Sequence, residues 1–335
     1  MKEKKYGFKI AACLLLLLAV VIIALMVGSY HISPLQVMQT LLGNGSKLQN
    51  FTIFQIRLPR IVLAVIVASA LGVSGGILQG ITRNPLAEPG MIGINAGAAL
   101  FVVLWISAGI TDYYSTLPFL TVLGMPLLAM TGSLLSVGLI YLLSSKGGIR
   151  PVRFILTGIG VNGGILAVIS FYQLNMSKGD YNQVLTWTSG SLWGSNWSYI
   201  FLTAPLVILL IGTVLFRSKN LDVLALGDEL AAGVGLSVQK ERMILLLLAT
   251  FLAALATSVA GSIAFLGLLG PQIAKRLTGP VHGIMLPMAA LVSSILLVGA
   301  DIIAKNLFSP LEIPVGIVVS IVGVPYFIYL MIKER

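Results

Sequence analysis

The sequence is poor in charge. Only 10% of its 335 residues are Asp, Glu, Lys or Arg, against roughly 25% in an average soluble domain. Apolar residues make up 57%, and the mean hydropathy is +1.01. A soluble globular protein is therefore excluded. The long uncharged runs predict an all-α integral membrane protein, because each span needs about 20 mainly apolar residues.

Residue types that build metal and catalytic sites are also scarce. Cys13 is the single cysteine, which excludes an internal disulfide framework and a cysteine-based metal site. The two histidines, His31 and His282, are far apart, and no H-E-x-x-H, G-x-S-x-G or G-x-x-x-x-G-K-[ST] pattern occurs. We therefore expect no metal, no directly bound cofactor and no enzyme activity. ATP hydrolysis would need another subunit.

Basic residues dominate the few charges and give a net charge of +10, but they lie between apolar runs and form no basic domain. Nucleic-acid binding is therefore not expected. Ten spans with both termini in the cytoplasm place more of the 21 Lys and Arg residues inside than nine spans do. We accordingly predict a polytopic bundle of about ten transmembrane helices, forming one domain over residues 1–335.

Two apolar runs need separate interpretation. The run from Ile10 follows four lysines and is taken as the first span, with a cleaved signal peptide as the alternative. The run 243–274 is too long for one upright span. Its glycines and proline predict that it turns and returns as a short, broken helix; these residues are Gly261, Gly267, Gly270 and Pro271.

The connection over about residues 218–241 is the most informative polar segment. The stretch from Arg217 to Arg242, with both arginines counted, contains four acidic and four basic residues around several glycines. Asp228 followed by ELAA predicts a helix N-cap, and the later glycines predict a C-cap. We expect a short amphipathic helix at the cytoplasmic face of the membrane, with a plain surface loop as the alternative.

Ionisable residues inside spans are few. Asp301 is the main one, and Lys305 follows four residues later, on the same face of a helix. The two could form a structural pair or belong to a proton relay. A relay would indicate an ion-driven secondary carrier, although no chain of carboxylates accompanies Asp301.

Small residues are densest over 72–99. Gly72, Gly75, Gly76 and Gly80 predict close helix packing. Five residues here are expected to shape the cytoplasmic gate region by packing and not to bind cargo: Gly76, Gln79, Arg83, Asn84 and Pro85.

Seven collinear segments then resemble the FecCD family of ABC-transporter permeases, which import iron(III) siderophores, haem and cobalamin. They are RLPR (57–60), GGILQGITRNPLAEPGMIGINAGA (75–98), WTSGSLWGSNW (187–197), LGDELAAGVGL (226–236), GSIAFLGLLGPQIAKR (261–276), GADIIAK (299–305) and EIPVGIVVSIVGVPYF (312–327). The resemblance implies a permease in the bacterial plasma membrane. Its implied partners are a second permease subunit, identical or related, two cytoplasmic ATPase subunits that use ATP, and an external substrate-binding protein.

The resemblance also implies residue roles. The segment LGDELAAGVGL matches the coupling helices that seat in the ATPase, through Leu226, Gly227, Asp228, Glu229, Ala231, Gly233 and Gly235. Arg57, Arg60 and Lys305 match external basic residues that meet acidic residues of the binding protein, with lipid-headgroup anchoring as the alternative. Gln272 stands where the family commonly has histidine.

The expected cargo is an iron(III)-siderophore, and cobalamin or haem is the alternative within the family. Two other classes remain open from the sequence. One is an ion-coupled secondary carrier that uses Asp301, and the other is a structural or assembly subunit without a pathway of its own.

Overall fold

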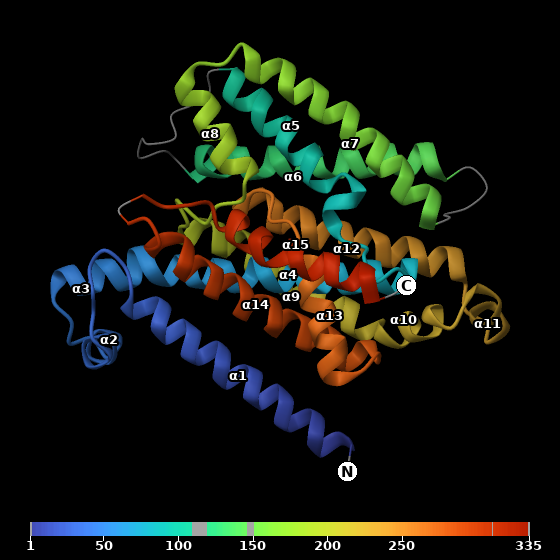
Figure 1. Cartoon of the computed structure of the whole chain (residues 1–335), viewed down its shortest axis with the longest axis horizontal. Coiled ribbons are helices and arrows are strands. Elements are labelled where there is room, and N and C mark those ends of the chain that lie inside the picture. The colour runs from blue at the N-terminus through green and yellow to red at the C-terminus, as the bar shows by residue number, and fades with distance from the viewer. Residues whose placement is uncertain (1, 109–118, 146–150, 310, 334–335) are drawn as a thin grey trace.

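A computed structural model describes residues 2–108, 119–145, 151–309 and 311–333 (Figure 1). Lys146, Arg150 and Arg335, which the ten-span topology counted as internal, lie outside these ranges. The elements are α1 (Lys2–Met26), α2 (Pro34–Leu41), α3 (Lys47–Phe51), the π-helix η1 (Thr52–Arg57), α4 (Leu58–Thr82), the 3₁₀ helix η2 (Pro89–Ile92), α5 (Ile94–Ser107), α6 (Phe119–Ser144), α7 (Pro151–Leu174), α8 (Lys178–Thr188), α9 (Trp197–Phe216), α10 (Ser218–Ala225), α11 (Asp228–Gly233), α12 (Val238–Ala260), α13 (Leu266–Thr278), α14 (His282–Asn306) and α15 (Val315–Lys333).

Within the described ranges, eight helices are long and apolar enough to cross a membrane: α1, α4, α6, α7, α9, α12, α14 and α15. Two shorter helices, α5 with 14 residues and α13 with 13, complete the bundle. At 1.5 Å per residue each is about 20 Å long, less than the roughly 30 Å hydrocarbon core. The expected all-helical bundle is confirmed, and the count of ten is approximate because two of the ten are shorter than the hydrocarbon core is thick.

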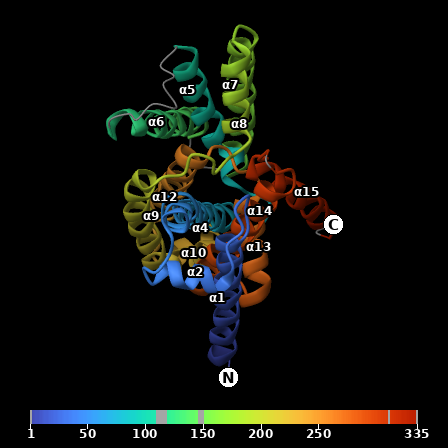
Figure 2. The ribbon, with the colours of Figure 1, turned by 90° about the vertical axis from the view of Figure 1, so that its left-hand side faces the viewer.

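Helix α4 lies at the centre of the bundle. It packs against α12, α13 and α14, and the view along the bundle in Figure 2 shows these helices around it, with α5 to α8 as a separate group above. Helices α1 and α15 project outward. The predicted small-residue packing is confirmed on α4, since a Cβ would overlap neighbouring atoms at Gly72, Gly75, Gly76 and Gly80. At Gly75 the neighbouring atoms belong to the backbone of Gly267 in α13, so the two helices touch directly.

The long apolar run divides between α12 and α13, as expected. Helix α12 ends at Ala260, Gly261 takes a positive φ of 67°, and Phe265 at φ 63° precedes α13. The expectation that Gly267, Gly270 and Pro271 also break the run is wrong, because all three lie inside α13. The two glycines there allow close packing against neighbouring elements.

Three glycines from separate segments meet near this break. Gly190 follows α8, Gly261 follows α12 and Gly316 begins α15, and a Cβ on each would overlap backbone atoms of another segment. Backbone hydrogen bonds join the same segments, from Ser191 N to the Ala260 carbonyl (2.9 Å) and from Gly316 N to the Gly190 carbonyl (3.0 Å). We call this contact the glycine joint.

The bundle has two distinguishable ends, which we name the α11 end and the α2 end (Figure 1). At the α11 end lie α10 and α11, the start of α1 and the end of α13, where the Lys9 ammonium donates to the Leu277 carbonyl. At the α2 end lie α2, α3, the start of α4 and the end of α14. The α11 end holds the polar segment that the sequence singled out.

Candidate functional site

The polar segment at the α11 end forms two short helices, α10 and α11. Gly227, at φ 122°, is the N-cap of α11 and Asp228 is its first residue, so the prediction of Asp228 as the N-cap is wrong by one position. The predicted glycine C-cap is confirmed at Gly235, at φ 86°. Its N–H donates to the Ala232 carbonyl and the next N–H, of Leu236, donates to the Ala231 carbonyl, which is a Schellman motif.

Apolar side chains of this segment divide between two environments. Leu221 and Leu224 of α10 and Ala231 of α11 are buried against the bundle. The side chains of Leu226, Leu230 and Val234 are well exposed, as is that of Glu229. One face of the segment is thus fixed to the helices, and the other presents a small mixed apolar and acidic surface.

The Asp228 carboxylate joins this segment to two long helices. It accepts from Arg83, which ends α4 in a left-handed conformation, and from Arg242 of α12 at 2.8 Å. Asp228 is 47% exposed and Arg242 only 2%. Partial burial raises the pKa of Asp228, but the two guanidinium groups outweigh it and the net pKa is lowered.

Two further ion pairs fix the flanks of the segment. Arg217, at the end of α9, donates to both carboxylate oxygens of Glu241 in α12 (2.9 and 2.7 Å). His282, the first residue of α14, contacts the Asp222 carboxylate of α10 through its backbone N–H (2.9 Å) and Nδ1 (2.6 Å). Sequence reasoning missed these four residues, because the partners lie 24 positions apart in the first pair and 60 in the second, and neither pair forms a motif.

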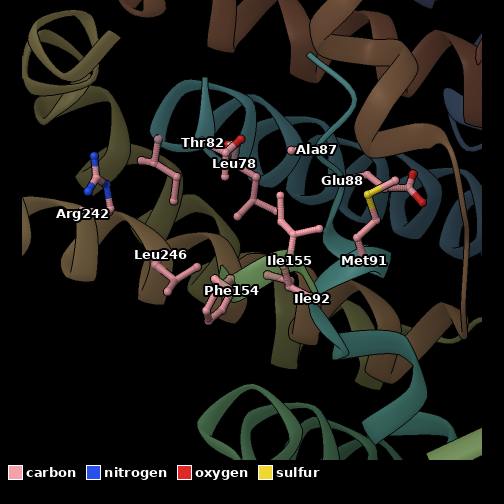
Figure 3. Close-up of a pocket in the computed structure, with 11 residues that line it drawn as sticks. Leu78, Thr82, Ala87, Glu88, Met91, Ile92, Phe154, Ile155, Arg242 and Leu246 are labelled. Carbon is pink, nitrogen blue, oxygen red and sulfur yellow. The ribbon is translucent and has the colours of Figure 1, made fainter. Parts of the chain in front are cut away.

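A small cavity lies on the bundle side of Arg242 (Figure 3). This cavity of about 20 Å³, close to the volume that one water needs, is lined by residues of α4, α7 and α12, with Arg242 at one edge and Glu88 at the other. Phe154 of α7 and Leu246 of α12 lie between them. Glu88, another residue that sequence reasoning missed, accepts from the N–H of Phe265 at 2.9 Å and holds the start of α13.

A much larger cavity, which we call the α13 cavity, opens beside the segment. Its volume is about 810 Å³, and residues of α4, α10, α13, α14 and α15 line it. Four of the five predicted gate residues are among them, namely Gly76, Gln79, Arg83 and Pro85. Asn84 is not, because its side chain accepts from the N–H of Leu86 (2.9 Å) in a turn.

Gln272 occupies a central place in the wall of this cavity. Its side-chain Nε2 donates to Gln79 Oε1 of α4 and to the Pro85 carbonyl, both at 2.9 Å. The residue that departs from the resembled pattern thus connects α13 to the end of α4. It does so by hydrogen bonds that involve no ionisable group.

At the α2 end, Arg60 of α4 forms the main ion pair. It donates from Nε and Nη2 to Asp301 of α14 (2.8 to 3.0 Å) and from Nη1 to Glu312 (2.8 Å), before α15. The side chain of Asp301 is 3% exposed and that of Arg60 12%. Of the two alternatives for Asp301 and Lys305, the structural pair does not form as a direct ion pair, since Asp301 binds Arg60 and the Lys305 ammonium donates to the Ala24 carbonyl at 3.2 Å.

Arg57 also differs from its expected place. It is 7% exposed, ends the π-helix η1, and donates to the carbonyls of Leu25 and Tyr30. The expectation that Arg57 is presented to a partner is wrong, because its guanidinium fixes the chain that follows α1. Arg60 and Lys305 are half-buried.

A second large cavity, of about 670 Å³, lies near Glu312. Its lining includes Trp187, Trp193 and Tyr199, together with amide side chains of α8. A cavity of this size lined by aromatic and amide groups is typical of small-molecule sites. In the described part of the chain, no group of three or more His, Cys, Asp or Glu side chains could hold a metal ion.

The profile of the FecCD transport family matches residues 16–333. This chain belongs to the FecCD transport family. The match covers nearly the whole chain, so the multi-pass bundle, the polar segment and both ends lie within the family domain.

Relatives and solved structures agree with this membership. The chain is 44% identical over 334 residues to the iron(3+)-hydroxamate import system permease protein FhuG of Bacillus subtilis (strain 168), covering all of this chain and 99% of that protein. It is 36% identical over 285 residues to the Fe(3+) dicitrate transport system permease protein FecD of Escherichia coli (strain K12), covering 85% and 86%. A solved metal-chelate type ABC transporter in an inward-facing conformation matches with a TM-score of 0.86 at 29% identity, covering 98% of this chain and 99% of that one.

FecCD membership identifies the chain as a transport component and a multi-pass membrane protein. The two large cavities and the polar segment therefore belong to a transport component.

Proposed function

We propose that the chain is the membrane-spanning permease of an ATP-driven importer of iron(III)-siderophore complexes, and that residues 1–335 form one permease domain. The observation that carries the proposal is the attachment of the α10–α11 segment to the bundle. Its ion pairs reach α4, α12 and α14. A displacement of this segment would therefore move the ends of three long helices together.

The segment also has the surface that an ATPase subunit requires. Leu226, Leu230 and Val234 are exposed beside Glu229 on an otherwise polar end. We propose that this surface seats in a cytoplasmic ATPase, with Gly227 and Gly235 setting the bends at the two ends of α11. The α11 end and both termini are then cytoplasmic. ATP is used by the ATPase, and the permease binds no cofactor directly.

The proposed assembly contains two permease subunits, identical or related, two ATPase subunits and an external binding protein. The α2 end would face the binding protein. Of the basic residues assigned to docking by sequence, Arg60 and Lys305 stay in this proposal, because both lie at that end and retain partial exposure. Charge pairs of this kind mainly set docking orientation and rate.

The cargo is proposed from the relatives, whose names specify iron(3+)-hydroxamate, iron-citrate and related iron uptake. The cavity near Glu312 supports a polar chelate, because aromatic, amide and hydroxyl groups line it. Haem and cobalamin are the alternative cargoes.

Uptake of radiolabelled chelates tests the proposal. Cells with and without the gene would receive a panel of iron-siderophores, haem and cobalamin. We expect loss of uptake for one siderophore class on deletion, and the same loss when ATP is depleted. Uptake that follows the ion gradient while ATP is maintained would replace the importer with a secondary carrier. Uptake unchanged by deletion would indicate an assembly subunit.

A further inference from the structure

A short connection links the polar segment at the α11 end to the start of α13. It comprises residues 83–88, between α4 and η2, and we call it the 83–88 strap. Its turn is braced internally, because the Asn84 carbonyl accepts from the N–H of Ala87 (3.1 Å) and the Asn84 side chain accepts from the N–H of Leu86 (2.9 Å). These bonds close the turn locally, so its residues are expected to move as one unit.

The strap begins at a contact with α11. The Arg83 guanidinium donates to the Asp228 carboxylate, and the two side chains are 40% and 47% exposed. An ion pair this exposed contributes little to stability. Its main effect is therefore to connect the first turn of α11 to the strap, beside the surface proposed to seat in the ATPase.

The middle of the strap lies against α13. Gln272 of α13 donates from Nε2 to the Pro85 carbonyl at 2.9 Å. Leu86 packs on a cluster that contains Leu268 and Leu269 of the same helix. As the strap continues from Pro85 to Leu86, its contacts on α13 thus move toward the start of that helix.

The strap ends at the residue that precedes α13. Glu88 Oε2 accepts from the N–H of Phe265 at 2.9 Å, and Phe265 is the N-cap of α13 with a φ of 63°. Among the described non-glycine residues, only Phe265 and Arg83 have a positive φ. A bulky residue keeps this backbone conformation only where its surroundings hold it, and such residues cluster at switch regions. The strap therefore joins the contact on α11 to a strained backbone position at the start of α13.

We propose that the 83–88 strap transmits a displacement of α11 to the start of α13, with Arg83 and Glu88 as positioning residues at its two ends. This role rests on the proposed function, because it requires an ATPase that moves α11. When Glu88 withdraws from Phe265, the left-handed backbone loses a restraint and can return to the right-handed helical region, which shifts the first turn of α13. Helix α13 lines the α13 cavity through Gln272, so the shift would reshape that cavity.

Size-matched substitutions of Glu88 test the strap in the complete transporter, reconstituted in vesicles with its ATPase and binding protein. Glu88→Gln keeps an acceptor oxygen, whereas Glu88→Met puts a weakly accepting sulfur in its place. With radiolabelled iron(III)-hydroxamate and iron(III)-citrate as probes, we expect Glu88→Met to transport roughly tenfold less chelate per ATP hydrolysed than the parent. Glu88→Gln should stay close to the parent. Parent-like transport by Glu88→Met, or an equal loss in both variants, overturns the proposal.

ATP hydrolysis and copurification of the ATPase separate a positioning role from a structural one. Both should stay at the parent level in Glu88→Met, because Glu88 contacts the start of α13 and not the exposed surface of α11. A parallel loss of hydrolysis, copurification and uptake would show that Glu88 only maintains the fold, which overturns the proposal. Parent uptake that continues without ATP would refute the proposed function, and the strap with it, before any variant is compared.

A matched control removes a buried contact of α4 that does not involve the strap. Ser74 donates from its hydroxyl to the Ala249 carbonyl of α12 at 2.7 Å and is fully buried. Ser74→Ala is expected to transport as much chelate per ATP as the parent does. An equal uncoupling in this control would show that any loosening of the bundle uncouples transport, and would overturn the specific role of the strap.

A double-mutant comparison tests whether the two ends of the strap act together. Arg83→Met removes the contact with Asp228 and leaves the pair of Asp228 with Arg242 in place. If Arg83 and Glu88 lie on one route, Arg83→Met with Glu88→Met should lower transport per ATP no further than the more severe single variant, roughly tenfold. A product of the two losses, roughly a hundredfold, would show that the two residues act independently and would overturn the strap as their link. Parent-like transport by Arg83→Met alone would overturn it as well.

Discussion

Both ends of the molecule contain an aspartate that is paired with arginine, but the two aspartates differ in burial. At the α2 end a carboxylate, Asp301, is held by Arg60 and is 3% exposed. At the α11 end a carboxylate, Asp228, is held by Arg83 and Arg242 and is 47% exposed. Breaking a buried pair leaves an uncompensated charge in a low dielectric, whereas exposed pairs contribute little to stability.

We interpret this difference in burial as a division between an ion pair that stabilises the fold and ion pairs that allow movement. The Arg60–Asp301 pair joins α4 to α14 inside the bundle and fixes their relative position. The contacts of Asp228 join the short helix α11 to α4 and α12, and water can reach this carboxylate because it is 47% exposed. We therefore expect mutations at the α2 end to affect folding, and mutations at the α11 end to affect transport.

The largest effect is expected from Asp301→Ala. Removing this carboxylate leaves the largely buried Arg60 guanidinium with Glu312 as its remaining described carboxylate partner. Loss of one partner of a buried pair typically costs about 3–5 kcal/mol. Thermal unfolding of the purified permease should show a clear decrease in its midpoint.

Glu312→Gln is the matched control for that comparison. Glu312 pairs with the same guanidinium but is 36% exposed, so we expect less than about 1 kcal/mol. Equal destabilisation by the two variants would show that burial does not distinguish the pairs.

A second prediction concerns transport. Asp228→Lys with Glu229→Lys is expected to uncouple ATP hydrolysis from uptake, because it reverses the charge that binds Arg83 and Arg242 and alters the exposed surface. We expect uptake to fall roughly tenfold, within the usual range of coupling energies. Uptake and copurification of the ATPase are the measurements.

Single substitutions sharpen that result. Asp228 and Glu229 are neighbours in the first turn of α11, and Asp228 is the one that forms ion pairs with two described arginines of the bundle, Arg83 and Arg242. Asp228→Asn should therefore lower uptake more than Glu229→Gln, although both remove one negative charge. The reverse order would assign coupling to the exposed surface alone.

The smallest effect is expected from pH. The lowered pKa of Asp228 means that its pairs are fully present above the ordinary pKa of aspartate and are lost only as pH falls through the lower folded value. Between about pH 8 and about pH 5 the difference in ATPase copurification between the parent and Asp228→Asn should stay constant. A difference that disappears near pH 6 would show that another group controls the contact.

Local signals in the sequence predicted much of the fold. The glycines of α4 indicated close packing, and the structure confirms it at Gly75 against Gly267. The division of the run 243–274 was visible from Gly261. The length of α13 was only coarsely predicted, because Gly267 and Pro271 resemble helix breakers locally but pack inside the helix.

The site was predicted only in part, since its charges are paired over long distances in sequence. Nothing near Asp301 indicates that Arg60, 241 positions away, binds it in preference to Lys305. His282 was recognisable only as an isolated residue until α10 brought Asp222 to it. The contacts of Arg57 could not be predicted either, because it binds backbone carbonyls, which are present at every residue.

The glycine joint limits the amino-acid substitutions that this protein can accept. Gly190, Gly261 and Gly316 belong to three distant stretches of chain, yet a side chain on any one would collide with the backbone of another. A deep mutational scan should therefore find all three positions intolerant, even to alanine, and a change at one should not be rescued by a compensating change at a second. A side chain at any of these positions would be tolerated only if whole helices shifted. We therefore expect the three positions to be among the slowest in the chain to diverge.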